Sequence, residues 1–238
     1  MVILKKMYLS FFLISLCLTA CKDSHNKSKN NQQKKLVDTI ETTTKRDSVV
    51  KKSHLDKDPL ITSKNVTSFL SQYGKENPET KAIIHTRLGD IHIELFTDTP
   101  LHRANFVLLI KSGYYNTTCF HRVVEDFIIQ AGQSDKSLTA EIRNNIGSYR
   151  VPAEINNYPH HKGVLSAARR WNMNPNKESD AFEFFIVHKP AGLHHLNKEH
   201  TAFGKVTKGL NVVDKIAKES IDKGEWPLND IDLNIELK

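Results

Sequence analysis

The sequence predicts a mainly β fold for residues 81–238, namely a closed antiparallel barrel capped by two α-helices. Two observations support this prediction. Short runs of apolar or alternating residues follow one another through this region, separated by turn residues. Two further segments carry the three- and four-residue apolar spacing of an amphipathic helix. Many short strands with few helices are typical of a barrel, which closes on itself and so leaves no exposed edge.

The first twenty residues have the pattern of a secretory signal peptide. Lys5 and Lys6 precede an apolar run from Met7 to Leu18, which is shorter than the roughly 20 residues of a membrane-spanning helix. The run ends at Leu18-Thr19-Ala20-Cys21, which resembles a bacterial lipobox. Cleavage there would leave Cys21 as a lipidated N-terminus. The alternative is an ordinary cleavable signal followed by an incidental cysteine.

Residues 21–62 are predicted to be the lipidated N-terminus and a disordered linker. Positions 22–58 hold no aromatic residue, Pro or Gly, so they cannot bury enough apolar area to offset the entropy of ordering. Their ten Lys and Arg against six Asp and Glu supply +4 of the formal net charge of +7, whereas positions 59–238 hold twenty-two against twenty-one. The excess charge suits an anionic membrane surface and argues against a nucleic-acid-binding face. Lys22 stands directly after Cys21, where an acidic residue is associated with retention in the inner membrane in some bacteria. Its absence favours the outer membrane of a bacterial cell envelope.

A short helix is predicted within residues 63–80, ahead of the barrel. Val66, Phe69, Leu70 and Tyr73 fall on one helical face, and Gly74 is placed to end the helix. We expect this helix to dock on the barrel domain through its apolar stripe.

The predicted domain begins with a hairpin and a helix. Apolar residues alternate from Ile84 to Leu88 and again from Ile91 to Leu95, with Gly89-Asp90 as the turn. Pro100 suits the first position of a helix that stops before Gly113. A second helix is predicted at Leu210–Glu219, and strands are predicted at Thr118–Val124, Phe127–Gln130, Gly163–Ala168, Glu183–Val187, Ala202–Val206 and Ile231–Leu237.

The chain has three cysteines, of which Cys17 would leave with the signal and Cys21 would be acylated. Cys119 then remains alone, so no intramolecular disulfide is expected. We interpret Cys119 as a small buried hydrophobic residue rather than a reactive thiol.

The stretch from Phe120 to Gly132, FHRVVEDFIIQAG, resembles the signature of the cyclophilin-type peptidyl-prolyl cis/trans isomerases. Other blocks resemble the rest of that family in the same order: Thr99–Phe106, Gly163–Ala168, Glu183–Ile186, and Leu196 and His200 before Phe203–Val206. The resemblance implies an eight-stranded antiparallel barrel closed by a helix at each end, with its substrate groove on the outer surface. It also implies rotation of X–Pro peptide bonds as the activity.

Such a reaction sets simple chemical demands. Rotation breaks amide resonance, which makes a barrier of about 18–20 kcal/mol, but it forms and cleaves no bond. A fixed hydrogen-bond donor and an apolar slot for the proline ring are sufficient, so no cofactor is expected. No metal is expected either, because the adjacent pairs among the twelve histidines lack the spacing of metal ligands.

The resemblance assigns roles to individual residues. Arg122 would hold the prolyl carbonyl and donate to the nitrogen lone pair that develops on twisting. Gln130 would orient Arg122 and the substrate backbone, which makes these two the predicted catalytic pair. The predicted pocket for the proline ring consists of Phe127, Ile128, Phe185 and Leu196, with His200 at its edge and with Ala168 and Arg169 pairing with the substrate backbone.

Four departures from the family pattern bear on this site. Glu183 replaces a glutamine; it could pair with Arg122 and draw it from the substrate, or it could favour a cationic substrate. His195 stands where some eukaryotic members carry a tryptophan that binds cyclosporin, so weak cyclosporin sensitivity is expected. Arg169-Arg170 makes one wall more basic, and Gln133–Ile146 lacks a glycine-rich acidic run.

Two functions are consistent with these residues. The first is an active, monomeric isomerase that assists the folding of exported proteins and binds unfolded or looped segments containing proline. The second is a non-catalytic binding module of the same fold for envelope client proteins, which Glu183 would favour.

Overall fold

The computed structural model describes residues 60–238, so the predicted signal peptide, Cys21 and most of the linker lie outside the described residues. The described part begins with a short strand, β1 (Ile61–Thr62), and a helix, α2 (Val66–Glu76). Gly74 does not end α2, contrary to the prediction. It is buried against the next helix, where a Cβ would lie 3.0 Å from the Cβ of Ala104. The glycine therefore allows the two helices to approach closely.

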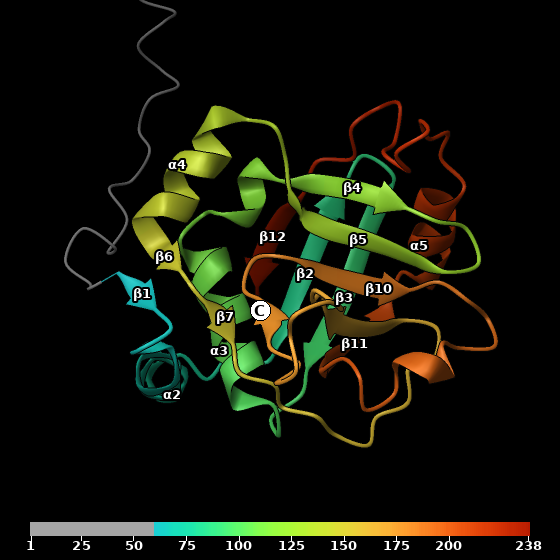
Figure 1. Ribbon diagram of the computed structural model, residues 1–238. Helices are drawn as coiled ribbons and strands as arrows, with labels where there is room; N and C mark the ends of the chain where they lie inside the picture. Colours follow the sequence, from blue (N-terminus) through green and yellow to red (C-terminus); the bar gives the residue numbers. More distant parts are fainter. Residues whose placement is uncertain (1–59) are drawn as a thin grey trace, which may run out of the picture. The chain divides into compact units, whose positions relative to one another are not determined.

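Eight strands form one antiparallel sheet in the order β12-β2-β3-β11-β8-β10-β5-β4 (Figure 1). Their bounds are β2 Lys81–Thr86, β3 Gly89–Leu95, β4 Cys119–Val123, β5 Ile128–Gln133, β8 Val164–Ala167, β10 Phe184–Val187, β11 Ala202–Lys208 and β12 Asn234–Leu237. The first hairpin turns at Arg87-Leu88 rather than at Gly89-Asp90, because Thr86 pairs with Gly89 and its hydroxyl donates to the Gly89 carbonyl at 2.9 Å.

The expected closed barrel is wrong, because this sheet is an open, curled half-barrel. Its edge strands are β4 and β12. Among the described residues, an isolated bridge between Cys119 and Asp232 links these two edges, and two backbone hydrogen bonds flank it. The register of β4 against β5 shifts on both sides of Phe120, and irregularities of this kind increase the local twist of a strand.

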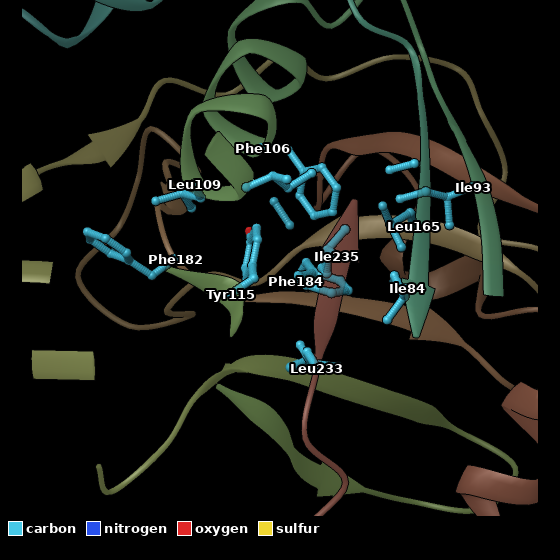
Figure 2. Close-up of a cluster of buried hydrophobic side chains, with 14 of the residues drawn as sticks. Ile84, Ile93, Phe106, Leu109, Tyr115, Leu165, Phe182, Phe184, Leu233 and Ile235 are labelled. Carbon is cyan, nitrogen blue, oxygen red and sulfur yellow. The ribbon is translucent and has the colours of Figure 1, made fainter. Parts of the chain in front are cut away.

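Two helices, α3 (Pro100–Lys111) and α5 (Leu210–Ala217), lie on either side of the sheet in Figure 1. Pro100 opens α3 as predicted. Figure 2 shows Phe106 of α3 among apolar side chains from several strands of the sheet. Its ring centroid lies 5.4 Å from that of Phe184 and 5.6 Å from that of Phe203. The concave face of the sheet and α3 therefore share one aromatic core.

Several short elements complete the structure. Helix α4 (Ser137–Ile146) occupies the segment in which the glycine-rich run was missing. Strand β6 (Gly147–Ser148) pairs with β1, and β7 (Arg150–Val151) pairs with β9 (Ser179–Asp180). Cys119 is buried and free, as predicted, and burial raises the pKa of its thiol to about 12. Within residues 60–238, no helix has both the length and the apolar character needed to cross a bilayer.

Candidate active site

A row of side chains crosses three neighbouring strands on the convex face of the sheet. Arg122 of β4 pairs with Gln130 of β5, and Gln130 pairs in turn with Phe185 of β10. Residues that pair directly across antiparallel strands project from the same face. The backbone register therefore brings together a cationic donor, an amide and an aromatic ring that are far apart in the sequence.

A β-bulge aims Arg122 at this face. Phe120 pairs with Ala131, whereas Arg122 pairs with the next residue along β5, Gln130, so His121 is an extra residue on β4. Phe120 is buried in the inner core, and Arg122 lies outside it. Without the bulge, strand alternation would place Phe120 and Arg122 on the same face. The bulge thus lets the strand keep its core residue and still present the arginine outward.

The row borders a hollow of about 410 Å³. Its apolar floor is buried and belongs to a second, smaller hydrophobic cluster that includes Ile128, Phe185 and Leu196. Phe127 and His195 stack at the rim with parallel rings, 6.2 Å between centroids. The hollow is lined by ten of the predicted site residues, namely Arg122, Phe127, Ile128, Gln130, Ala168, Arg169, Phe185, His195, Leu196 and His200, together with Trp171.

The guanidinium of Arg122 is held at one end and open at the other. Its Nε donates to the carboxylate of Glu225 at 2.6 Å, and both side chains are part-exposed, at 35% and 41%. Its Cζ lies 5.7 Å from the centroid of the Phe127 ring. Among the described residues, neither of the two terminal nitrogens of Arg122 makes a hydrogen bond. Four N–H groups thus remain for a ligand in the hollow.

Glu183 does not pair with Arg122. Its carboxylate accepts a hydrogen bond from Gln130 Nε2 at 2.8 Å and lies 3.6 Å from His121 Nε2. Burial raises the pKa of Glu183, but hydrogen bonds from His121 and Gln130 and the charge of His121 outweigh burial, so the pKa lies below its ordinary value. A carboxylate only accepts, so it fixes the amide nitrogen of Gln130 toward itself and leaves the amide oxygen for other donors. Glu183 lines a neighbouring hollow of about 430 Å³ that shares Gln130.

Comparison with known proteins identifies the family to which this chain belongs. Residues 81–236 match the family described as cyclophilin type peptidyl-prolyl cis-trans isomerase/CLD. The chain belongs to this cyclophilin family. Peptidyl-prolyl cis-trans isomerase-like 3 of Dictyostelium discoideum is 38% identical over 152 residues, which are 62% of this chain and 88% of that protein. Peptidyl-prolyl cis-trans isomerase CYP18-1 of Arabidopsis thaliana is 39% identical over 154 residues, which are 63% and 91% of the two chains.

Solved structures agree with this membership. A cyclophilin-type isomerase of Cryptosporidium parvum matches with a TM-score of 0.57 and 28% identity, covering 67% of this chain and 98% of that one. A second structure of that protein, determined in the presence of the dipeptide Ala-Pro, matches with a TM-score of 0.56 and 29% identity. The chain is a cyclophilin-type peptidyl-prolyl cis-trans isomerase with the cyclophilin fold.

His200 is a neutral, fixed part of the cyclophilin hollow. It is buried, and its Nδ1 donates to the Ala167 carbonyl at 3.0 Å. Burial lowers the pKa of His200 to about 4; the Ala167 hydrogen bond opposes this change and the charge of Arg169 adds to it. Because a carbonyl only accepts, the proton sits on Nδ1 at neutral pH and Nε2 remains an acceptor.

Two residues of the site were not predicted from the sequence. Glu225 is 103 positions away from Arg122, and a loop that follows α5 brings it to β4. No local pattern indicates such a contact. Trp171 lines the hollow and lies two positions after Arg169, so an aromatic residue beside the predicted backbone-binding segment was an available signal.

We predict that Glu225 is a positioning residue for Arg122. Glu225→Gln removes the ion pair and leaves the guanidinium less restrained. An exposed ion pair is worth at most about 1 kcal/mol, so kcat/KM should fall by up to about fivefold, mostly in kcat. The measurement is prolyl isomerisation kinetics of the variant and the parent. Glu219→Gln is the matched control, because Glu219 pairs with Arg87 instead. An unchanged or raised kcat in Glu225→Gln would contradict the prediction.

We also predict that His200 destabilises the protein in mild acid. The ordinary pKa of 6.5 applies to the unfolded chain, whereas the pKa is about 4 in the folded chain. As pH falls through this window, the unfolded chain takes up the proton first, and the free energy of unfolding drops by on the order of 3 kcal/mol. His200→Asn keeps a donor for Ala167 and should flatten the pH dependence measured by urea unfolding at about pH 7 and about pH 4.5.

A second histidine provides the control for this experiment. A hydrogen bond to Asp90 raises the pKa of His85. In the folded chain His85 therefore binds its proton at higher pH than in the unfolded chain. Its protonation stabilises the folded protein as pH falls, which is the opposite of the effect of His200. His85→Asn should therefore not flatten the pH dependence of the free energy of unfolding. An equal pH dependence of the free energy of unfolding in the parent and in His200→Asn would contradict the prediction.

Proposed function

We propose that X–Pro bonds rotate in the hollow on the convex face, with Arg122 and Gln130 as the catalytic residues. One observation carries this proposal, namely the row in which the register places Arg122, Gln130 and Phe185 side by side. The row sets a charged donor directly beside an apolar floor, which is what a twisting prolyl amide requires.

The geometry suggests how the rotation is stabilised. The proline ring would rest on Phe185 and Leu196, which are already buried in the second hydrophobic cluster. The open end of the Arg122 guanidinium would donate to the prolyl carbonyl oxygen and to the nitrogen as it becomes pyramidal. Gln130 would support Arg122 through the amide oxygen that Glu183 leaves available. Because the donors are fixed before the substrate arrives, no reorganisation is needed when the amide twists.

The position of Glu183 supports catalysis over the alternative of a binding module. A carboxylate at position 183 that paired with Arg122 would draw the guanidinium away from a substrate. It is instead engaged by Gln130 and His121, while Arg122 is paired with Glu225. Glu183, the residue that favoured a non-catalytic module, therefore orients the side chain of Gln130.

The decisive test compares two variants of residues 60–238 in a prolyl isomerisation assay. Arg122→Ala removes the preorganised donor, so kcat/KM should fall by about 10²–10³-fold. Glu183→Gln keeps an acceptor for Gln130 and should stay within a few-fold of the parent. Lys205→Ala removes a cation that pairs with Glu94 and does not line the hollow, so it is the matched control. Full activity in Arg122→Ala, or activity gained only in Glu183→Gln, would overturn the assignment.

We further propose that the protein is a monomeric lipoprotein of a bacterial cell envelope. The positive residues before a short apolar run and the lipobox-like Leu18–Cys21 support an anchor at Cys21, and the missing acidic residue after it supports the outer membrane. Its substrates would be proline-containing unfolded or looped segments of exported proteins. The Cryptosporidium structure determined in the presence of Ala-Pro supports a ligand of this class.

The anchor has its own test in the full-length chain. Expressed in a bacterium that is fed radiolabelled palmitate, the parent should carry label and sediment with membranes. Cys21→Ala should lose both properties, whereas Cys17→Ala should keep them, because Cys17 lies within the signal. Label that persists in Cys21→Ala would refute the lipoprotein proposal.

A further inference from the structure

We propose that Trp171 and Met173 form a recognition surface for a large apolar side chain next to the proline of the substrate. Both lie on the loop of residues 169–178, between β8 and β9. Trp171 is 56% exposed and Met173 is 97% exposed. Trp171 also lines the hollow assigned to the proline ring. The inference deepens the proposed function, since it names a substrate preference of the same site.

The exposed tryptophan is held firmly in place. The Cζ of Arg169 lies 4.3 Å from the centroid of its ring, and the ring meets that of His200 edge-on with centroids 5.2 Å apart. The Arg169 side chain is only 3% exposed, and it donates twice to Glu199, to the carbonyl and to the carboxylate, each at 2.7 Å. Lys177 donates to the other carboxylate oxygen at 2.8 Å. An ion-pair network centred on the buried Arg169, with part-exposed Glu199 and Lys177 as its partners, therefore supports an aromatic ring that faces solvent.

The loop backbone is also built for this display. Met173 and Lys177 adopt left-handed φ angles of 56° and 54°, which strain non-glycine residues. Buried Asn174 compensates, because its side chain donates to the carbonyls of Arg170 and Glu178 and accepts from the Glu178 amide. The chain thus holds a strained loop that leaves two large apolar side chains uncovered.

The position of this surface identifies its occupant. Trp171 is continuous with the hollow, where it touches His200 at the pocket edge. A group that reaches it while proline fills the hollow must come from a nearby residue of the same polypeptide, because consecutive Cα atoms are only about 3.8 Å apart. An exposed aromatic face favours aromatic or large aliphatic side chains, and the exposed Met173 two positions away on the same loop adds a flexible apolar group. We therefore assign the surface to a large apolar residue within two positions of the proline.

The test uses paired peptides that differ only in Phe or Ala at each position within two residues of the proline. Isomerisation is followed by NMR exchange, which avoids a coupling protease with preferences of its own. In the parent, at least one Phe peptide should have a kcat/KM about tenfold above its Ala partner. Trp171→Ala should reduce this ratio to about twofold or less. Trp171→Phe should restore most of it.

Controls separate this inference from the proposed function. Leu228→Ala removes an exposed apolar residue that does not line the hollow, so the Phe-to-Ala ratio should not change. Equal rates for the two peptides in the parent, or a preference that survives Trp171→Ala, would overturn the inference. If the parent turns over neither peptide, the proposed function fails, and the affinities from NMR titration with the same peptides still decide whether Trp171 favours Phe.

Discussion

The register of β5 between its two neighbours is the constraint on which the site depends. Gln130 is paired with Arg122 on one side and with Phe185 on the other. Backbone hydrogen bonds, rather than flexible side chains, therefore fix the relative positions of the cationic donor, the amide and the aromatic ring. A slip of one residue would turn Gln130 into the core and bring Ala131 to the surface. Ala131 lies within the inner core, and burying the polar Gln130 there would be costly. The same packing that stabilises the fold therefore keeps Arg122, Gln130 and Phe185 in line.

The sheet carries buried apolar residues on both of its faces. Phe184 and Phe185 are adjacent and both buried, the first in the large inner core with α3 and the second in the outer cluster under the hollow. The floor of the hollow is consequently formed before a substrate binds, and little ordering remains to be done. The charged groups lie around this floor, where Glu225 restrains one end of Arg122 and Glu183 orients Gln130. Stability and preorganisation come from the same contacts.

Local patterns predicted the eight strands of the main sheet, helices α3 and α5 and the buried Cys119, but they did not predict helix α4 or the two-residue strands β1, β6, β7 and β9. They failed where distant segments decide the outcome. Alternation alone would place Phe120 and Arg122 on one face, and only the extra residue His121 separates them. The closed barrel was wrong because, within the described residues, β4 and β12 do not pair along their length, and the two edges meet at an isolated bridge between Cys119 and Asp232, which precedes β12. The family resemblance indicated which residues line the hollow. It did not indicate the hydrogen-bond partners of Arg122 and Glu183, because loop residues such as Glu225 have no recognisable sequence pattern.

The most direct test of this account is a crystal structure of the protein with a bound peptide that contains Ala-Pro. The proline ring should rest on Phe185 and Leu196, and a terminal nitrogen of Arg122 should lie within hydrogen-bonding distance of the prolyl carbonyl. Glu225 should still hold Nε, and the Cα atoms of β4, β5 and β10 should move by less than about 1 Å. A peptide bound elsewhere, or an Arg122 that must leave Glu225 and shift its strand to reach the substrate, would contradict the claim that the register preorganises the site.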